Sequence, residues 1–337
     1  MIQKVLIQCL GISKPCRGWV YPIPFHSREG VKPSPTFKIA VQIAVLGLLS
    51  SIPSQAKLNV VATLPDYGEV ARAIGGDKVD VTVLAKPTED SHFVDAKPSF
   101  ILKLNRADAL IEGGAELEMG WLRPLLEGSR NSKIQAGASG RIVASEGIQM
   151  LDIPATVSRA QGDIHTMGNP HFMVDPLRAM KVAEHIANAF SKLDPASASA
   201  YEANLKMFKE TMDRKMQEWT KALGPFHGQS VAAYHDSWVY FADRFGFHID
   251  IFLEPKPGIS PSPSHLATVI KKMKQQHIRA ILVEPFHDRK IAESVASHTG
   301  AQVVDFAQYP GAFSHTQTYF ELMDTLVTRL AGALSSR

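Results

Sequence analysis

Short apolar runs that suit buried β-strands alternate along this chain with stretches whose apolar residues recur at helical spacing. Such alternation predicts parallel sheets with helices on their faces, so the expected fold class is α/β. Ligands of such folds collect in the loops beyond the carboxyl ends of the strands. We expect strands at 58–63, 79–84, 109–111, 230–234, 280–283 and 302–305, and helices at 67–74, 99–105, 238–245, 265–275, 290–298 and 319–334.

One expected helix is much longer than the others. The segment 195–223 has no internal proline or glycine, and large apolar side chains recur in it every three or four residues, from Tyr201 to Trp219. At 1.5 Å per residue this helix is roughly 40 Å long, enough to cross a whole domain. We therefore expect two lobes with parallel-type sheets flanked by helices, joined by one long rigid helix. Their boundaries are 57–194 for the N-terminal lobe, 195–224 for the linking helix and 225–337 for the C-terminal lobe.

The N-terminal segment has the order of a secretory signal. The basic residue Lys38 is followed by an apolar run at 39–49 and then by small residues that end at Ala56. This order is typical of a cleaved signal, and the run is too short to span a bilayer. We expect residues 1–56 to be a leader, with the signal at 39–56, that is removed after Ala56. The alternative is a buried helix or an anchor that stays.

Removal of this leader changes the charge and the thiol content of the chain. The leader has six basic residues and one acidic residue, so the net charge falls from +3 to −2 without it. Nothing in the remainder offers a basic face to nucleic acid, which excludes that partner. Cys9 and Cys16 also lie in the leader. An exported protein without cysteine must bind any metal through histidine and carboxylate side chains.

Four possible metal ligands lie on loops at the edges of the two lobes. Three imidazoles and one carboxylate fill a tetrahedron around Zn²⁺ at about 2.0–2.2 Å, and such a closed site stores metal instead of activating water. Histidine also discriminates against Mg²⁺ and Ca²⁺, which prefer oxygen ligands. The ligands, two from each lobe, could meet in one cleft between the lobes. They are His92 after the strand 79–84, His171 just before a helix that begins at Asp175-Pro176, His235 after the strand 230–234, and Asp305 at the end of 302–305.

Several local motifs resemble those of one protein family. They are Ala115-Glu116-Leu117-Glu118 with Trp121, Gly162-Asp163-Ile164-His165, Gly168-Asn169-Pro170-His171-Phe172-Met173-Val174-Asp175-Pro176, His235-Asp236-Ser237-Trp238-Val239-Tyr240-Phe241, Gly258-Ile259-Ser260 with Pro261-Ser262-Pro263, and Val283-Glu284-Pro285. Together they resemble the zinc/manganese-type substrate-binding proteins of bacterial ABC transporters. The motifs run in family order over about residues 58–334, and the Asn-Pro-His and His-Asp segments are the most specific.

The resemblance implies two α/β lobes bridged by a long helix, with the metal in the cleft between them. His92 matches the family's first ligand, in a segment that reads Asp-Ser-His where the family usually has Asp-Pro-His. His171 matches the second ligand and His235 the third. Zinc members have histidine at this third position, whereas manganese members tend to have a carboxylate.

The fourth ligand stays open among several groups. Family members take an acid from the loop after the last strand as the fourth ligand, and Asp305 is the candidate here. If the alignment with the family is off by a few residues, Gln308 or water would take this place instead. Glu284 is the reserve candidate for the fourth ligand. His165 is close enough in sequence to His171 to join the shell or to assist capture. We expect His287, in contrast, to be a surface residue.

The resulting hypothesis is a periplasmic substrate-binding protein that captures Zn²⁺ and delivers it to an inner-membrane ABC permease, acts as a monomer and is not an enzyme. The alternatives are a Mn²⁺- or Fe²⁺-binding protein of the same fold, a zinc-dependent hydrolase with an open water position, and a surface adhesin on the same scaffold. A hydrolase needs a general base beside the metal. The sequence has no His-Glu-x-x-His segment that would provide one.

Overall fold

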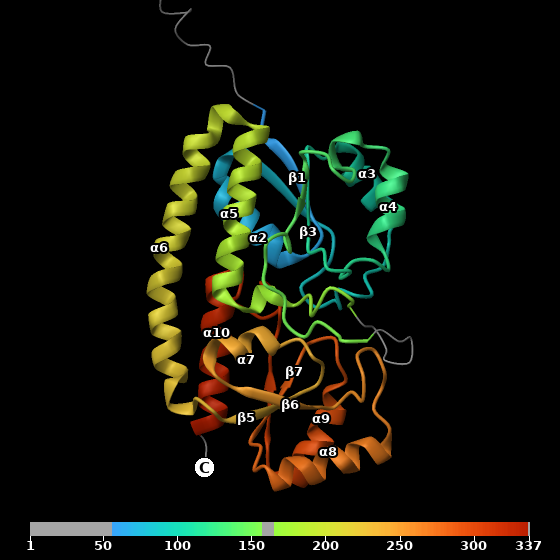
Figure 1. Cartoon of the computed structure of the whole chain (residues 1–337), viewed down its shortest axis with the longest axis vertical. Coiled ribbons are helices and arrows are strands. Elements are labelled where there is room, and N and C mark those ends of the chain that lie inside the picture. The colour runs from blue at the N-terminus through green and yellow to red at the C-terminus, as the bar shows by residue number, and fades with distance from the viewer. Residues whose placement is uncertain (1–55, 157–164, 336–337) are drawn as a thin grey trace, which may run out of the picture. The chain divides into compact units, whose positions relative to one another are not determined.

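The computed structural model describes residues 56–156 and 165–335, and these contain two four-stranded parallel sheets flanked by helices (Figure 1). The expected leader, apart from Ala56, lies outside the described residues, as do the motif residues 162–164. In the described part of the chain, no helix combines the length and the apolar character that crossing a membrane requires.

The N-terminal lobe is built on a sheet with strand order β2-β1-β3-β4. Its inner strands β1 and β3 pair in parallel, with Val60 opposite Ala109, and their side chains are mostly buried. The helices α2 and α3 each begin with a proline. Proline suits this position because the amide groups of the first turn have no acceptor within the helix, so the missing N–H costs no hydrogen bond. The elements are β1 Leu58–Ala62, α2 Pro65–Gly75, β2 Val79–Val83, α3 Pro98–Arg106, β3 Ala109–Glu112, α4 Leu122–Ser129, β4 Arg141–Val143 and α5 Pro176–Leu193.

The C-terminal lobe repeats this arrangement with the order β6-β5-β7-β8. In both sheets the strand order reverses beside the first strand, and a crevice opens outside the carboxyl ends of the strands at such a point. His235 follows β5 at this edge of the second sheet. The elements are β5 Ser230–Ala233, α7 Val239–Phe245, β6 His248–Phe252, α8 Pro263–Gln275, β7 Ala280–Val283, α9 Arg289–Thr299, β8 Gln302–Asp305 and α10 Tyr319–Ser335.

The long helix α6, Ala198–Leu223, runs beside both lobes (Figure 1). Near its start Asn204 donates a hydrogen bond to the carbonyl of Ile74 in α2, at 2.9 Å. Near its end both Lys215 and the indole of Trp219 bind Asp324 of α10, at 2.7 and 2.8 Å. The helix is therefore fastened to one lobe at each end, which confirms the expected linking helix.

A continuous apolar core extends through both lobes. It contains Val60 of β1, Trp219 of α6, Phe241 of α7 and Leu330 of α10, each at most 2% exposed. A second, smaller core lies between the other face of the C-terminal sheet and the helices α8 and α9. Because a shared core has to be opened before the lobes can separate, large hinge motions are costly here.

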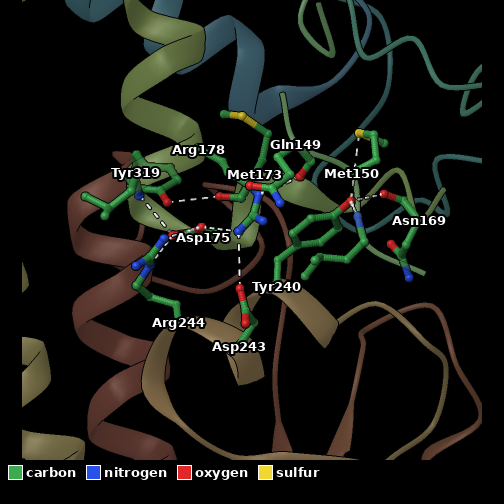
Figure 2. A network of polar contacts seen from close by, with 12 residues as sticks. Gln149, Met150, Asn169, Met173, Asp175, Arg178, Tyr240, Asp243, Arg244 and Tyr319 are labelled. Carbon is green, nitrogen blue, oxygen red and sulfur yellow. Dashed lines mark hydrogen bonds and ion pairs between the residues drawn. The ribbon is translucent and has the colours of Figure 1, made fainter. Parts of the chain in front are cut away.

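A polar network joins the loop before α5 to helix α7 of the other lobe (Figure 2). Asp175 is completely buried, and its carboxylate caps α5 by accepting a hydrogen bond from the amide of Leu177 at 3.0 Å. The same carboxylate binds Arg178 at 2.5 Å and accepts two hydrogen bonds from Arg244, at 2.7 and 2.9 Å. A bidentate arginine contact of this kind fixes geometry as well as charge. The network sets the position of α7 relative to the N-terminal lobe.

Tyr240 of α7 continues this network toward the Asn-Pro-His segment (Figure 2). Its hydroxyl donates to the carbonyl of Asn169 at 2.6 Å and accepts from the amide of Leu151 at 2.9 Å. The guanidinium of Arg178 lies over its ring, 4.5 Å from the centroid. From the neighbouring α10, Tyr319 donates to the carbonyl of Met173 at 2.9 Å. The backbone on both sides of His171 is thus held by side chains from the second half of the chain.

The α/β fold and the two parallel sheets agree with the sequence prediction, and most expected elements lie within a few residues of their observed bounds. Three elements were missed. The helix α4 contains Pro124, and the strand β4 has only three residues, so neither has a pattern of useful length. The strand β6 reads His-Ile-Asp-Ile-Phe, so it alternates polar and apolar residues and lacks the continuous apolar run by which the other strands were recognised.

Substitution of Asp175 tests the importance of the buried carboxylate. We expect Asp175→Ala to lower the free energy of unfolding by about 3–5 kcal/mol, because it leaves two guanidinium groups without their buried partner. Urea denaturation at neutral pH measures this change. Asp213→Ala, at an exposed position of α6, is the control. A loss for Asp175→Ala no larger than that of the control would contradict the role of this network.

Candidate metal centre

Three histidine rings from distant parts of the chain meet between the lobes. The ring centroids of His92 and His171 are 5.1 Å apart, those of His92 and His235 are 5.7 Å apart, and those of His171 and His235 are 5.6 Å apart. One ring nitrogen from each residue lies within 4.8 Å of the other two. Three nitrogen atoms at this spacing can surround a single divalent ion with little further movement.

His92 is held by the residues next to it. Asp90 accepts hydrogen bonds from the backbone amide of His92 at 2.9 Å and from its ring Nδ1 at 2.8 Å. This contact fixes the tautomer and leaves Nε2 free to bind a metal. The loop itself is held by Trp121, whose indole donates to the carbonyl of Ser91 at 2.9 Å. This hydrogen bond holds the backbone directly before His92.

The turn before His171 depends on Gly168 and Asn169. Gly168 has a φ of +106°, and a Cβ atom there would lie 2.7 Å from the carbonyl oxygen of Leu151, so only glycine fits. The side chain of Asn169 accepts a hydrogen bond from the amide of His171 at 3.0 Å and donates one to the carbonyl of Asp236 at 2.7 Å. One amide group therefore ties the His171 loop to the His235 loop.

His235 follows β5 and is oriented by Glu254, which follows β6. The ring Nδ1 of His235 lies 2.9 Å from a carboxylate oxygen of Glu254, and both side chains are about nine-tenths buried, at 11% and 9% exposure. Burial lowers the pKa of His235, but the hydrogen bond that its ring donates to Glu254 and the negative charges of Glu284, Glu254 and Asp90 outweigh it and raise the pKa overall. Glu254 leaves Nε2 of His235 available as a ligand.

His165 lies next to this group on the side of His92, but its ligand atoms are not within 4.8 Å of those of all three rings. Its Nε2 lies 3.0 Å from Nε2 of His92, and the ring centroids are 5.1 Å apart. Its Nδ1 is buried and has no hydrogen-bond partner. A cavity of about 160 Å³ beside the rings is lined by His165, His171 and His235. The structure thus brings to the site the histidine that the sequence left open.

Burial keeps two of these rings neutral. It lowers the pKa of His171 well below its usual value, and the neighbouring imidazoles of His92, His235 and His165 lower it further. Burial also lowers the pKa of His165 to about 4, with a further contribution from His92. Nδ1 of His171 is buried without a partner. Neutral imidazoles are the form that binds a metal ion, so these rings are ready to act as ligands.

Asp305 does not belong to this group, and our expectation for the fourth ligand needs correction. Its carboxylate pairs with Arg289, and its side chain is 51% exposed. The alternation along β8 explains this, because Val304 points into the core and Asp305 therefore points outward. Gln308, three residues later, is buried near His171 and donates to the hydroxyl of Ser237 at 3.1 Å. Gln308 is thus nearer to the rings than Asp305 is, and the identity of the fourth ligand stays a proposal.

Two further residues differ from their expected places. Glu284, the reserve ligand, is fully buried behind His235, where it accepts a hydrogen bond from the indole of Trp238 at 2.7 Å. His287, expected at the surface, is only 10% exposed in its side chain and stacks on Tyr234. Glu254 was missed by the sequence analysis, because the preceding strand β6 was missed. A carboxylate placed after a recognised strand would have been a candidate.

Buried acids form the wall behind His171. Asp66 is 3% exposed and lines the same small cavity as His171 and Gln308. Burial raises the pKa of Asp66 to about 8, against the opposing hydrogen bond from the amide of Tyr67. Burial also raises the pKa of Glu118 to about 7, although Glu118 accepts hydrogen bonds from Thr63 and Gly113. A pKa of about 8 makes Asp66 largely protonated at neutral pH, so this acid adds little negative charge beside His171.

The profile of the ZnuA family, zinc-uptake complex component A, periplasmic, matches residues 60–333. The chain belongs to this family. Among curated proteins it is similar to the manganese ABC transporter substrate-binding lipoprotein PsaA of Streptococcus anginosus, with 22% identity over 295 residues, 84% of this chain and 91% of that protein. It is also similar to the zinc-binding protein AdcA of Streptococcus pyogenes, with 23% identity over 80% of this chain and 55% of that protein.

Solved structures of this family share the fold. A crystal structure of ZnuA superimposes with a TM-score of 0.71 at 25% identity, covering 83% of this chain and 100% of that one. A manganese-bound periplasmic metal-binding protein from Candidatus Liberibacter asiaticus has a TM-score of 0.68 at 24% identity, covering 82% and 99%. The chain is thus a substrate-binding protein of a metal ABC transporter, which acts outside the cytoplasm with a membrane permease. The comparisons favour neither the hydrolase nor the adhesin.

The raised pKa of Asp66 predicts a pH dependence of stability. A folded-state pKa of about 8 means that the native protein holds a proton that the unfolded chain releases near pH 4. The stability that this proton provides is complete below about pH 4 and is lost as the pH rises through 8. We expect Asp66→Asn to gain stability relative to wild type between pH 5 and 8, by at most about 1.4 kcal/mol per pH unit.

Urea denaturation at several pH values measures this difference. Asp80→Asn, at an exposed position of β2, is the matched control and should follow the wild type. A difference between Asp66→Asn and wild type that stays constant over this pH range would show that Asp66 is ionised in the folded protein.

Proposed function

We propose that the transported ion is Zn²⁺ and that His92, His171 and His235 capture it in the periplasm for delivery to the permease. The observation that carries this proposal is the convergence of three ligand nitrogens, from both lobes, within 4.8 Å of one another. Two of the rings have a carboxylate on the opposite nitrogen, Asp90 for His92 and Glu254 for His235. Such partners orient a metal-bound imidazole and increase its basicity.

The donor set favours zinc over manganese. As found in the described part of the chain, the group around His92 contains three imidazoles and no carboxylate. Imidazole suits zinc, whereas manganese is better served by carboxylate and water. We propose His165 as the fourth ligand, because its Nε2 lies 3.0 Å from that of His92. Two ligand atoms in a zinc tetrahedron with bonds of about 2.0 Å are about 3.3 Å apart.

Manganese is the second candidate, because several similar curated proteins carry it in their names, among them PsaA. Those proteins are 22% identical to this chain, which is too distant to transfer a metal preference by itself. Elemental analysis of protein purified without added metal, followed by competition between Zn²⁺ and Mn²⁺, distinguishes the two ions. Bound manganese that zinc does not displace would overturn the zinc proposal.

Loss of one ring should greatly weaken zinc binding. We expect His171→Ala to lower the affinity for Zn²⁺ by more than about 100-fold. Removing a residue that only hydrogen-bonds to a ligand already lowers metal affinity by up to about 100-fold, and loss of the ligand itself should cost more. His165→Ala should lower it less, because the three rings that already lie within 4.8 Å of one another remain. Competition with a chromogenic chelator measures both affinities. His298→Ala, at an exposed position of α9, is the control. Unchanged affinity in His171→Ala would exclude the proposed site.

Acid should release the ion. A ligating imidazole must be neutral, and His235, whose pKa is raised, takes up a proton before the buried His171 and His165 as the pH falls. We expect the affinity for Zn²⁺ to be constant above about pH 7.5 and to fall below it. Chelator competition from pH 8 to pH 5.5 tests this, with the chelator's own protonation taken into account. An affinity independent of pH would argue against imidazole ligands.

A further inference from the structure

A second group of possible ligands lies on the other side of His235. His235, Glu254 and His287 offer ligand atoms that are all within 4.8 Å of one another. The three residues follow β5, β6 and β7, so they stand along the carboxyl edge of the C-terminal sheet. None of the contacts proposed for the first ion uses Glu254 or His287 as a ligand.

One buried atom of this group and one of a neighbouring side chain have no hydrogen-bond partner. They are Nε2 of His287 and Oε2 of Glu284, which lie 3.6 Å apart on side chains that are 10% and 0% exposed. The distance is too long for a useful hydrogen bond. It equals the separation of about 3.3–3.6 Å between two ligand atoms of a tetrahedral zinc ion with bonds of 2.0–2.2 Å. Buried polar atoms without partners are costly, and a cation between them would satisfy both.

Neighbouring side chains hold these groups in place. The ring of His287 stacks on Tyr234, with centroids 4.1 Å apart and an interplanar angle of 11°. The other oxygen of Glu284 accepts the hydrogen bond from Trp238 at 2.7 Å, which leaves Oε2 facing His287. Glu254 is fixed by its contact with the ring of His235 at 2.9 Å. Ligands that are already held lose little freedom when they bind an ion.

We propose that Glu254, His287 and Glu284 hold a second divalent transition-metal ion next to His235, probed most directly with Zn²⁺. The imidazole selects against Mg²⁺ and Ca²⁺, which prefer oxygen ligands. This position binds more weakly than the first, because the ring of His235 is shared between the two groups and the two cations repel each other. The inference rests on the proposed function only for the assignment of His235 to the first ion.

Titration of the metal-free protein with Zn²⁺ in a calorimeter tests this inference. We expect the wild type to bind one tight and one weaker equivalent. His287→Gln should lose the weaker equivalent and keep the tight affinity within about threefold, and Glu284→Gln should weaken the second equivalent at least tenfold. His298→Gln, at an exposed position of α9, is the control and should bind two equivalents. Circular dichroism checks that each variant is folded, and Glu284→Gln provides the test if His287→Gln does not fold.

The outcomes separate this inference from the proposed function. Removal of a ligand of the first ion in His92→Ala should abolish the tight equivalent and leave the weaker one. A wild type that binds a single equivalent, or a folded His287→Gln that still binds two, would overturn the second position. A His92→Ala variant with both equivalents unchanged would instead overturn the proposed function.

Discussion

The buried carboxylate of Asp175 is the contact on which the arrangement of the two lobes depends. It caps the first turn of α5 in one lobe and accepts a bidentate hydrogen bond from Arg244 of α7 in the other (Figure 2). A buried ion pair gains little net stability, because both charges lose their hydration. Its geometry is demanding, however, and it places α7, with Tyr240, against the segment that carries His171. The contact therefore specifies a position more than it adds stability.

The rings that meet between the lobes are oriented by unequal means. His92 and His235 each have a carboxylate on Nδ1, whereas Nδ1 of His171 is buried without a partner. The carboxylates orient the first two rings, and that of Glu254 also helps to raise the pKa of His235, whereas burial lowers the pKa of His171 and keeps its ring neutral. The group thus combines two rings next to acids with one that lies deep in the core, and in our proposal all three bind the same ion.

The sequence predicted the alternation of strands and helices because both lobes consist of buried parallel strands, whose apolar runs are easy to recognise. His92 and His235 could be predicted from their places after strands, His171 from its place before a capped helix, and all three from their motifs. The sequence alone could not exclude Asp305 as a ligand. Val304 packs into the core, and this packing decides that the next side chain, Asp305, points outward. Glu254 was missed because the strand before it is short and alternates polar with apolar residues, whereas the other strands were recognised from continuous apolar runs.

The side chain of Asn169 contacts the His171 loop with its carbonyl and the His235 loop with its amide group. Together with the core shared by both lobes, this bridge keeps the two loops from spreading apart. We therefore expect a bound ion to leave by exchanging its ligands one at a time for those of an acceptor, since the loops do not spread to release it. Access of the competing ligand to the rings would then govern how long the cargo stays bound.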